Sequence, residues 1–199
     1  MLKDLEAHPF RPGTLITATN GAVFLSEDGG KHWRNLGCHT QVNGLKAVCV
    51  LDLPDARGNL QLTVIASHSI YGAAWKQPAV SDKWQPLSEG LVPGPESDEE
   101  ISDIVVYTHQ QKQEVYASQT FTGKLYQLDW PTKSFHAVSD WTDGIAGARC
   151  IDGLSSAAVS IIGCKDGGLF EVPLVLPVPN STRLKEIELS LKRIAAKPL

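Results

Sequence analysis

Ser26–Trp33, with the sequence SEDGGKHW, is the most informative segment of the chain, and it lies between two short apolar runs. Ser26 and Asp28 have short side chains whose oxygens accept hydrogen bonds from nearby backbone amides in turns. Gly29 and Gly30 adopt a positive φ at little steric cost, which a tight turn requires. The segment therefore predicts a hairpin that joins two neighbouring β-strands.

A related pattern recurs along the chain, in which a β-rich run ends in small residues and is followed by a turn and an aromatic residue. The small residue is Ala18, Ala66, Ala117 or Gly163, so successive units are 48, 51 and 46 residues apart. A near-constant period on the order of 50 residues is typical of β-propellers, whose blades are sheets of short antiparallel strands. The sequence therefore predicts an all-β, propeller-like fold with about four blades.

A second aromatic position keeps the same register, because Trp33, Trp84 and Phe135 follow one another at intervals of 51 residues. The fourth unit lacks this aromatic residue. The acidic, proline-containing segment 92–100 separates the second unit from the third, and we expect a solvated loop there, with an acidic docking site as the alternative. The predicted repeat domain is 1–175, with blades at about 1–42, 43–92, 98–144 and 146–175, followed by a C-terminal tail at 176–199.

The Ser26–Trp33 segment closely resembles the Asp-box, or bacterial neuraminidase repeat (BNR), whose pattern is Ser/Thr-x-Asp-x-Gly-x-Thr-Trp, and it departs from the pattern only at His32. The resemblance implies a hairpin between the outer two strands of a blade, with the tryptophan packed inward. It also implies a structural, non-catalytic role for the matching residues Ser26, Asp28, Gly30 and Trp33. The superfamily includes sialidases, xyloglucan-cleaving glycosidases, sortilin-type receptors and the photosystem II assembly factor, and a shared fold does not select among their functions.

The C-terminal tail breaks the repeat and fits two interpretations. Leu184, Ile187, Leu191 and Ile194 have the spacing of one face of a helix, and the composition of the tail favours a helix. Ile187, Leu189 and Leu191 also alternate with polar residues, as in an amphipathic strand. A helix is the preferred prediction, and a strand is the alternative.

Composition and charge exclude several classes of protein. Of the 199 residues 42% are hydrophobic, and the net charge is -4 without a stripe of Lys and Arg that would bind a nucleic-acid backbone. No apolar run approaches the roughly 18 residues that span a bilayer, and the N-terminus does not resemble a signal peptide. We therefore expect a cytoplasmic protein with no membrane span and no nucleic-acid partner. The cysteines lack a C-x-x-C pair and are interpreted as buried thiols: Cys38, Cys49, Cys150 and Cys164.

No catalytic constellation stands out, so no catalytic residue, metal site or cofactor is predicted. The arginines do not match the carboxylate clamp of a sialidase, and the histidines lack the spacing of metal ligands. A glycoside hydrolase needs two carboxylates about 5 to 10 Å apart. The candidates on strand ends or loops resemble ordinary turn aspartates: Asp103, Asp129, Asp140, Asp143 and Asp152.

Three tryptophans outside the repeated position, Trp75, Trp130 and Trp141, are the candidate binding residues. Exposed aromatic residues often mark interaction surfaces or sugar platforms, and the alternative is that these three pack between adjacent blades. We expect a non-catalytic binding or scaffold module with a protein partner, such as an assembly factor. The alternative function is a glycoside hydrolase or carbohydrate-binding protein that uses the loop face of the propeller.

The number of predicted blades leaves ring closure open. Asp-box propellers commonly have six or more blades, and this chain has sequence for about four. Three arrangements are compatible with the sequence: a closed four-blade ring, a half-ring completed by a second copy or another protein, and a piece of a longer protein. An open arc would leave apolar blade faces uncovered, which soluble proteins avoid.

Overall fold

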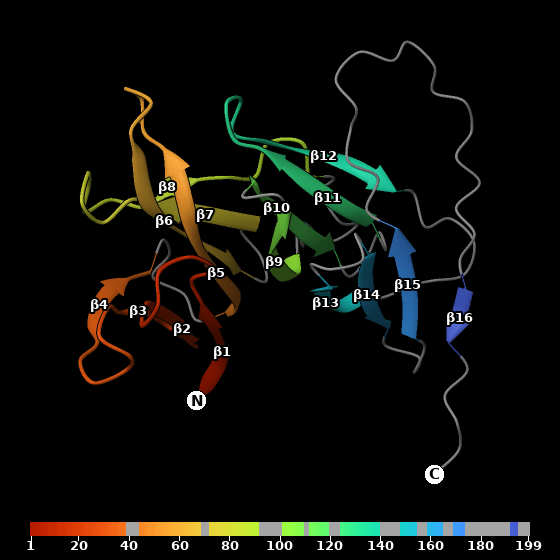
Figure 1. Cartoon of the computed structure of the whole chain (residues 1–199), viewed down its shortest axis with the longest axis horizontal. Helices are drawn as coiled ribbons and strands as arrows, with labels where there is room; N and C mark the ends of the chain where they lie inside the picture. The colour runs from red at the N-terminus through yellow and green to blue at the C-terminus, as the bar shows by residue number, and fades with distance from the viewer. Residues whose placement is uncertain are drawn as a thin grey trace.

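The computed structural model describes residues 1–38, 44–68, 72–91, 101–109, 112–119, 124–139, 148–154, 159–164, 169–173 and 192–194, the last four ranges by their backbone. These residues form four antiparallel sheets of four strands each (Figure 1). The prediction of an all-β, propeller-like fold with about four blades is confirmed. In the described part of the chain no helix is long and apolar enough to cross a membrane.

The strands of each sheet pair with one another in chain order. Sheet 1 contains β1 (Leu2–Ala7), β2 (Leu15–Thr19), β3 (Val23–Ser26) and β4 (Arg34–Gly37), and sheet 2 contains β5 (Leu45–Pro54), β6 (Leu60–His68), β7 (Gly72–Lys76) and β8 (Gln85–Pro86). Sheet 3 contains β9 (Ile101–His109), β10 (Lys112–Gln119), β11 (Lys124–Asp129) and β12 (Ser134–Ser139). Sheet 4 contains β13 (Ala148–Leu154), β14 (Val159–Cys164), β15 (Leu169–Pro173) and β16 (Lys192–Ile194).

The last strand of sheet 4 comes from the C-terminal tail, beyond residue 175, where the sequence pattern ends the repeat. Lys192–Ile194 forms β16, which pairs antiparallel with β15 along the edge that β14 does not occupy. These three residues are extended and not helical, because the edge of β15 offers backbone hydrogen bonds that a helix would leave unused. The rest of the tail, over which a helix is predicted, lies outside the described residues.

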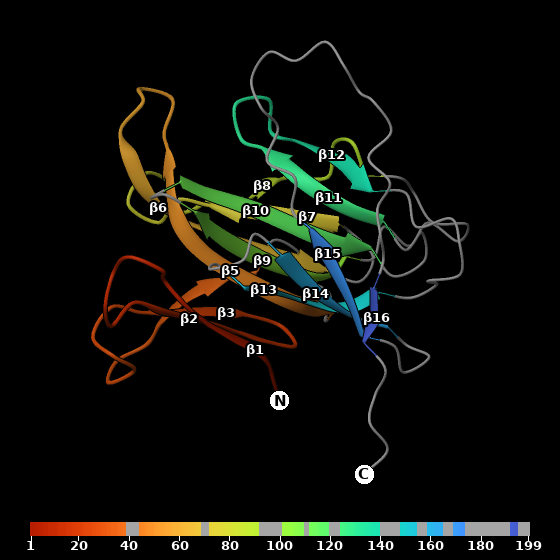
Figure 2. The same cartoon turned by 45° about the vertical axis from the view of Figure 1, so that its right-hand side comes forward.

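The first strands of the sheets lie next to one another, with β1 against β5, β5 against β9 and β9 against β13. Sheets 1 and 4 form the two ends of an arc in Figure 1, and sheets 2 and 3 lie between them. Figure 2, turned by 45°, shows β5, β9 and β13 in the middle of the molecule and β1 below them, near the N-terminus. Successive sheets therefore pack face to face, as the blades of a propeller do.

Two apolar cores hold sheets 1 to 3 together. One lies between sheets 1 and 2, and the other between sheets 2 and 3. β5 supplies both cores because successive side chains of a strand point to opposite faces: Val48 and Val50 belong to the first core, Cys49 and Leu51 to the second. This double burial explains why β5 is almost continuously apolar.

The segment after β8 fixes sheet 2 to sheet 3. The backbone N–H of Phe135 in β12 donates a hydrogen bond of 2.7 Å to the carbonyl of Glu89. Gly90 has φ +85° and lies so close to sheet 3 that a Cβ at this position would overlap the carbonyl oxygen of Phe135. Only glycine combines this backbone conformation with this close approach.

Candidate functional site

The hairpin between β3 and β4 has the hydrogen bonds of a turn closed by its own side chains. The hydroxyl of Ser26 accepts a bond of 2.9 Å from the N–H of Gly30 and donates one of 2.9 Å to Asp28 Oδ1. The same carboxylate accepts the backbone N–H of His32 at 2.9 Å. The side chains of Ser26 and Asp28 therefore stabilise the turn and are not aimed at a substrate.

His32, the one departure from the Asp-box pattern, adds a side-chain hydrogen bond to this turn. Its ring Nδ1 lies 2.6 Å from Asp28 Oδ2. The backbone hydrogen bond from His32, followed by the bond from its ring, lowers the pKa of Asp28 to about 2. The carboxylate consequently stays ionised over the whole physiological range.

Trp33 departs from the expectation that it packs inward. It is 39% exposed, and its indole N–H donates to the carbonyl of Gly30 in its own turn, at 3.0 Å. At the equivalent position of sheet 2, Trp84 is half-buried and its indole N–H donates to Leu36 in sheet 1, at 3.0 Å. In sheet 3, Phe135 is 1% exposed in the core between sheets 2 and 3. The aromatic residue at this position thus packs on the preceding sheet in sheets 2 and 3, whereas no sheet of the described residues packs on this side of sheet 1.

The structure places two of the predicted binding tryptophans between blades. Trp130 is 7% exposed, packs edge to face on Trp75 with ring centroids 4.9 Å apart, and donates to the carbonyl of Pro54 in sheet 2 at 2.8 Å. Lys133 Nζ lies 3.3 Å from the centroid of the Trp130 ring. Both tryptophans therefore pack mainly on other parts of the protein. Trp141 lies outside the described residues.

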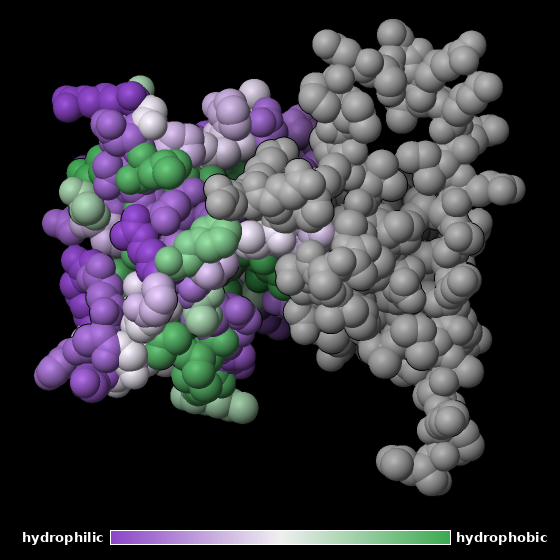
Figure 3. All heavy atoms as spheres, viewed as in Figure 1, coloured by the Kyte–Doolittle hydropathy of each residue, from purple (hydrophilic) through white to green (hydrophobic). Residues whose placement is uncertain are grey.

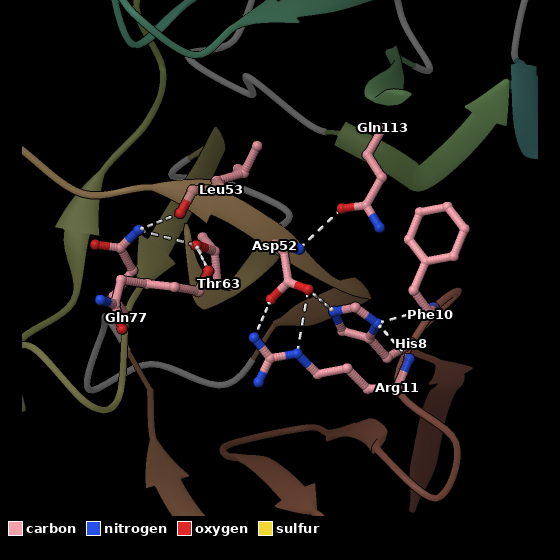
Figure 4. Close-up of polar contacts among 9 residues, drawn as sticks. His8, Phe10, Arg11, Asp52, Leu53, Thr63, Gln77 and Gln113 are labelled. Atoms are coloured by element: carbon pink, nitrogen blue, oxygen red, sulfur yellow. Dashed lines mark hydrogen bonds and ion pairs between the residues drawn. The ribbon is translucent and has the colours of Figure 1, made fainter. Parts of the chain in front are cut away.

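A polar cluster joins sheets 1, 2 and 3 (Figure 4). His8 is buried, and its Nδ1 accepts the backbone N–H groups of Phe10 and Arg11, each at 3.1 Å. The ring proton therefore resides on Nε2, which lies 3.5 Å from Asp52 Oδ2. Arg11 also donates from Nε to Asp52 at 3.1 Å, and the N–H of Asp52 donates to Gln113 Oε1 at 2.8 Å.

The environment of this cluster favours the neutral form of His8. Burial lowers the pKa of His8, and the charge of Arg11 lowers it further, whereas Asp52 raises it. The pattern of the sequence does not reveal the cluster, because Arg11 and Asp52 are 41 residues apart and Asp52 and Gln113 are 61 apart. The cluster links three sheets, and its carboxylate is already bound by Arg11.

A pocket of about 400 Å³ opens at one end of sheet 3. β10 pairs with β9 as far as Lys112, and β11 pairs with β12 as far as Asp129. The pairing between β10 and β11, however, ends at Tyr116 and Gln127. The two strands therefore separate over their last residues, and the residues on both sides of this split line the pocket.

The polar side chains that line the pocket are Gln113, Glu114, Gln127, Asp129 and His136, next to an apolar part that includes Leu53, Val115 and Leu128. Gln113 Nε2 is buried and has no hydrogen-bond partner, while its Oε1 is held by Asp52. This nitrogen is therefore an unsatisfied polar group of the interior, with almost no surface that a ligand could contact.

Two carboxylates give the pocket a negative charge. Glu114 accepts a bond of 3.0 Å from the hydroxyl of Tyr116, and burial together with the charge of Glu114 raises the pKa of Tyr116, so that this hydroxyl stays a donor. Asp129 accepts the hydroxyl of Thr132 at 2.6 Å, and its Oδ2 lies 4.0 Å from His136 Nε2. The carboxylate of Asp129 keeps acceptor capacity for a further partner.

The described side chains include no group of three His, Cys, Asp or Glu that would hold a metal ion. Neither Cys38 nor Cys49 forms a disulfide within the described part of the chain, and burial raises the pKa of the Cys49 thiol, which leaves it unreactive. Of the aspartates considered for hydrolysis, Asp129 lines the pocket and Asp103 accepts the N–H of the next residue. The side chains of Asp140, Asp143, Asp152, Cys150 and Cys164 lie outside the described part of the chain.

No protein-family model matches the sequence, and no curated protein sequence matches it. Among solved structures, the chain is similar to the β-propeller domain of Cps50 (Swd1) from Myceliophteria thermophila, with a TM-score of 0.62 and 16% identity over 96% of this chain and 56% of that one. It is also similar to an ancestral GH74 enzyme, with a TM-score of 0.57 and 16% identity over 86% of this chain and 25% of that one.

A third similar structure is YCF48 bound to D1 peptide, with a TM-score of 0.50 and 15% identity over 84% of this chain and 48% of that one. The chain therefore spans between a quarter and just over half of the length of these three proteins. At such identities the likeness shows the fold and not the activity. The chain has the fold of a β-propeller.

Proposed function

We propose that the chain is a non-catalytic protein-interaction module, serving as an assembly or scaffolding factor, which binds an extended segment of a partner protein in the pocket between β10 and β11. The observation that carries this proposal is the split between two strands of sheet 3, with polar groups on both sides. A similar propeller, YCF48, is seen with a bound peptide, which supports a peptide ligand at the level of the fold.

Strand edges in the pocket suit an extended peptide. Over Lys112–Val115, β10 pairs with β9 along one edge, while its other edge borders the split. Leu128 and Asp129 of β11 likewise pair with β12 along one edge and border the split with the other. A peptide that lies along such an edge gains main-chain hydrogen bonds without a change in the sheet.

Side chains in the pocket define the kind of segment that fits. The carboxylate of Asp129 attracts a positive charge. The apolar part of the pocket covers the methylene groups of a long side chain. The preferred ligand is therefore an extended segment with a lysine or arginine.

The test uses fluorescence anisotropy with two matched sets of short labelled peptides, in which a central lysine is either present or replaced by norleucine. We expect the lysine peptides to bind, and Asp129→Asn to weaken them about tenfold, because a charge-assisted contact is lost. Asp82→Asn, in the exposed turn of sheet 2, is the control and should leave binding unchanged. Equal binding of the two peptide sets, or an equal effect of the two variants, would contradict the proposal.

A screen with aryl-glycosides and polysaccharides separates the module from the alternative glycoside hydrolase. We expect no turnover by the wild-type chain. Turnover that Asp129→Asn abolishes and Asp82→Asn leaves intact would assign the pocket to hydrolysis. It would contradict the proposal of a non-catalytic module.

A further inference from the structure

Sheet 1 has one covered and one uncovered face. Ile16 and Ala18 of β2 belong to the core with sheet 2, and Asp4 of β1 accepts the N–H of Val48 in sheet 2 at 2.8 Å. Leu5 adjoins Asp4 and therefore points the other way, to the face that we call the outer face of sheet 1. It is 52% exposed there.

The outer face of sheet 1 is apolar. Leu2 pairs with Thr19 and Leu5 with Thr17, which alternate with the core residues of β2, so both leucines lie on this face. Leu2 is 60% exposed, and Trp33 adds a third large apolar side chain near Leu15. Figure 3 shows hydrophobic side chains gathered over β1, near the N-terminus. Such a patch on a regular sheet is typical of an interface.

The repeat itself indicates what covers this face. Trp84 of sheet 2 donates to the carbonyl of Leu36 in β4, the fourth strand of the preceding sheet. Trp33 has the same place in sheet 1, and its N–H donates to Gly30 in its own turn. The fourth strand of sheet 4 is β16, and Figure 1 shows it at the opposite end of the arc from β4. In the described part of the chain, no strand takes the place beside Trp33 that β4 takes beside Trp84.

We propose that the outer face of sheet 1 binds sheet 4 of a second copy of this chain, so that two arcs of four sheets close one ring. Two such contacts, related by a twofold axis, cover the outer face of sheet 1 in both copies. The size of the four-sheet arc supports a second copy as the partner, because 96% of this chain matches 56% of a similar propeller domain, so that two arcs have about the size of one ring. One copy thus supplies about half of a ring, and β16 of the partner supplies the carbonyl for Trp33.

Sedimentation equilibrium of the full chain over a range of concentrations tests this proposal. We expect the wild type to have twice the chain mass of 21.6 kDa at high concentration. Leu5→Glu should weaken the dimer at least about 100-fold, because a charge would be buried in an apolar contact. Leu60→Glu, at a position that is 66% exposed in sheet 2, is the matched control and should leave the dimer intact.

Leu2→Glu provides a second variant of the outer face should Leu5→Glu fail to fold, and a thermal melt of each variant verifies folding. A wild type that stays monomeric at every concentration would overturn the proposal. So would a dimer that neither outer-face variant weakens, or one that Leu60→Glu weakens equally.

Discussion

Trp33 and Trp84 hold the same position in two consecutive sheets, yet their surroundings differ. Trp84 follows another sheet and donates its N–H across the interface to Leu36, whereas Trp33 donates within its own turn and stays 39% exposed. The local sequence places each tryptophan at the end of a hairpin, and the neighbouring sheet decides whether it is buried. The difference indicates that, among the described residues, Trp84 is covered by the neighbouring sheet 1 and no sheet covers Trp33.

The largest expected effect distinguishes the buried and exposed members of this aromatic series. Phe135→Ala should destabilise the fold by about 3 to 5 kcal/mol, because it removes a fully buried ring. Trp33→Ala should cost the monomer only about 1 kcal/mol, because much of its ring is already in water. Denaturant unfolding measures both variants at a concentration where the chain is monomeric. Equal losses would remove the distinction between the two positions.

A second prediction concerns the contact between sheets 2 and 3. Gly90→Ala should cost about 2 to 3 kcal/mol, because the new Cβ overlaps the carbonyl of Phe135. Gly58 is a matched control, since its φ of +83° is nearly the same and no atom lies within 4 Å of its Cβ position. Gly58→Ala should cost about 1 kcal/mol from backbone strain alone. Indistinguishable unfolding midpoints for the two variants would show that the close approach is not maintained in solution.

The third prediction concerns His8, which lies at the junction of sheets 1 and 2. Because burial lowers the pKa of His8 below its usual 6.5, the unfolded chain binds a proton that the folded chain resists. The free energy of unfolding should therefore fall as the pH drops through 6.5, and His8→Gln should flatten this dependence. Chemical denaturation between about pH 7 and 5 measures it. An unchanged slope in His8→Gln would assign the pH dependence to other groups.

The smallest expected effect is confined to the β3–β4 hairpin. The pKa of Asp28 is lowered to about 2, so its contribution to stability is complete above its usual value of 3.8 and is lost as the pH falls toward 2. Asp28→Asn should reduce this acid dependence and lower the melting temperature less than Gly90→Ala does. Melting curves recorded across this acidic range test it. A melting curve of Asp28→Asn with the acid dependence of the wild type would contradict the assignment.

The period of the sequence was sufficient to predict four sheets, because strands and turns depend on local patterns of apolar and turn-forming residues. Burial could not be predicted in the same way. Trp33 matches the Asp-box pattern and is exposed, while Trp130 lies beside a turn and is buried against Trp75 and Pro54. Both outcomes depend on which sheet lies next to the residue, and a local pattern carries no information on that.

The candidate site, too, could not be predicted from the sequence. Its pocket arises where β10 and β11 stop pairing, a feature of strand geometry with no signature in residue type. In the tail, the alternation of polar and apolar residues indicated a strand, whereas the composition favoured a helix. The structure shows a strand at Lys192–Ile194. Edge pairing with β15 outweighs this intrinsic propensity over these three residues.

The most direct test of the central claim is a dilution series of the chain with fluorine-labelled tryptophan, followed by ¹⁹F NMR. The signals of Trp33 and Trp84 are assigned with Trp33→Phe and Trp84→Phe. The account predicts that the Trp33 resonance shifts between high and low concentration, as the outer face of sheet 1 is covered and uncovered, while that of Trp84 stays constant. A Trp33 resonance that is the same at every concentration would contradict it.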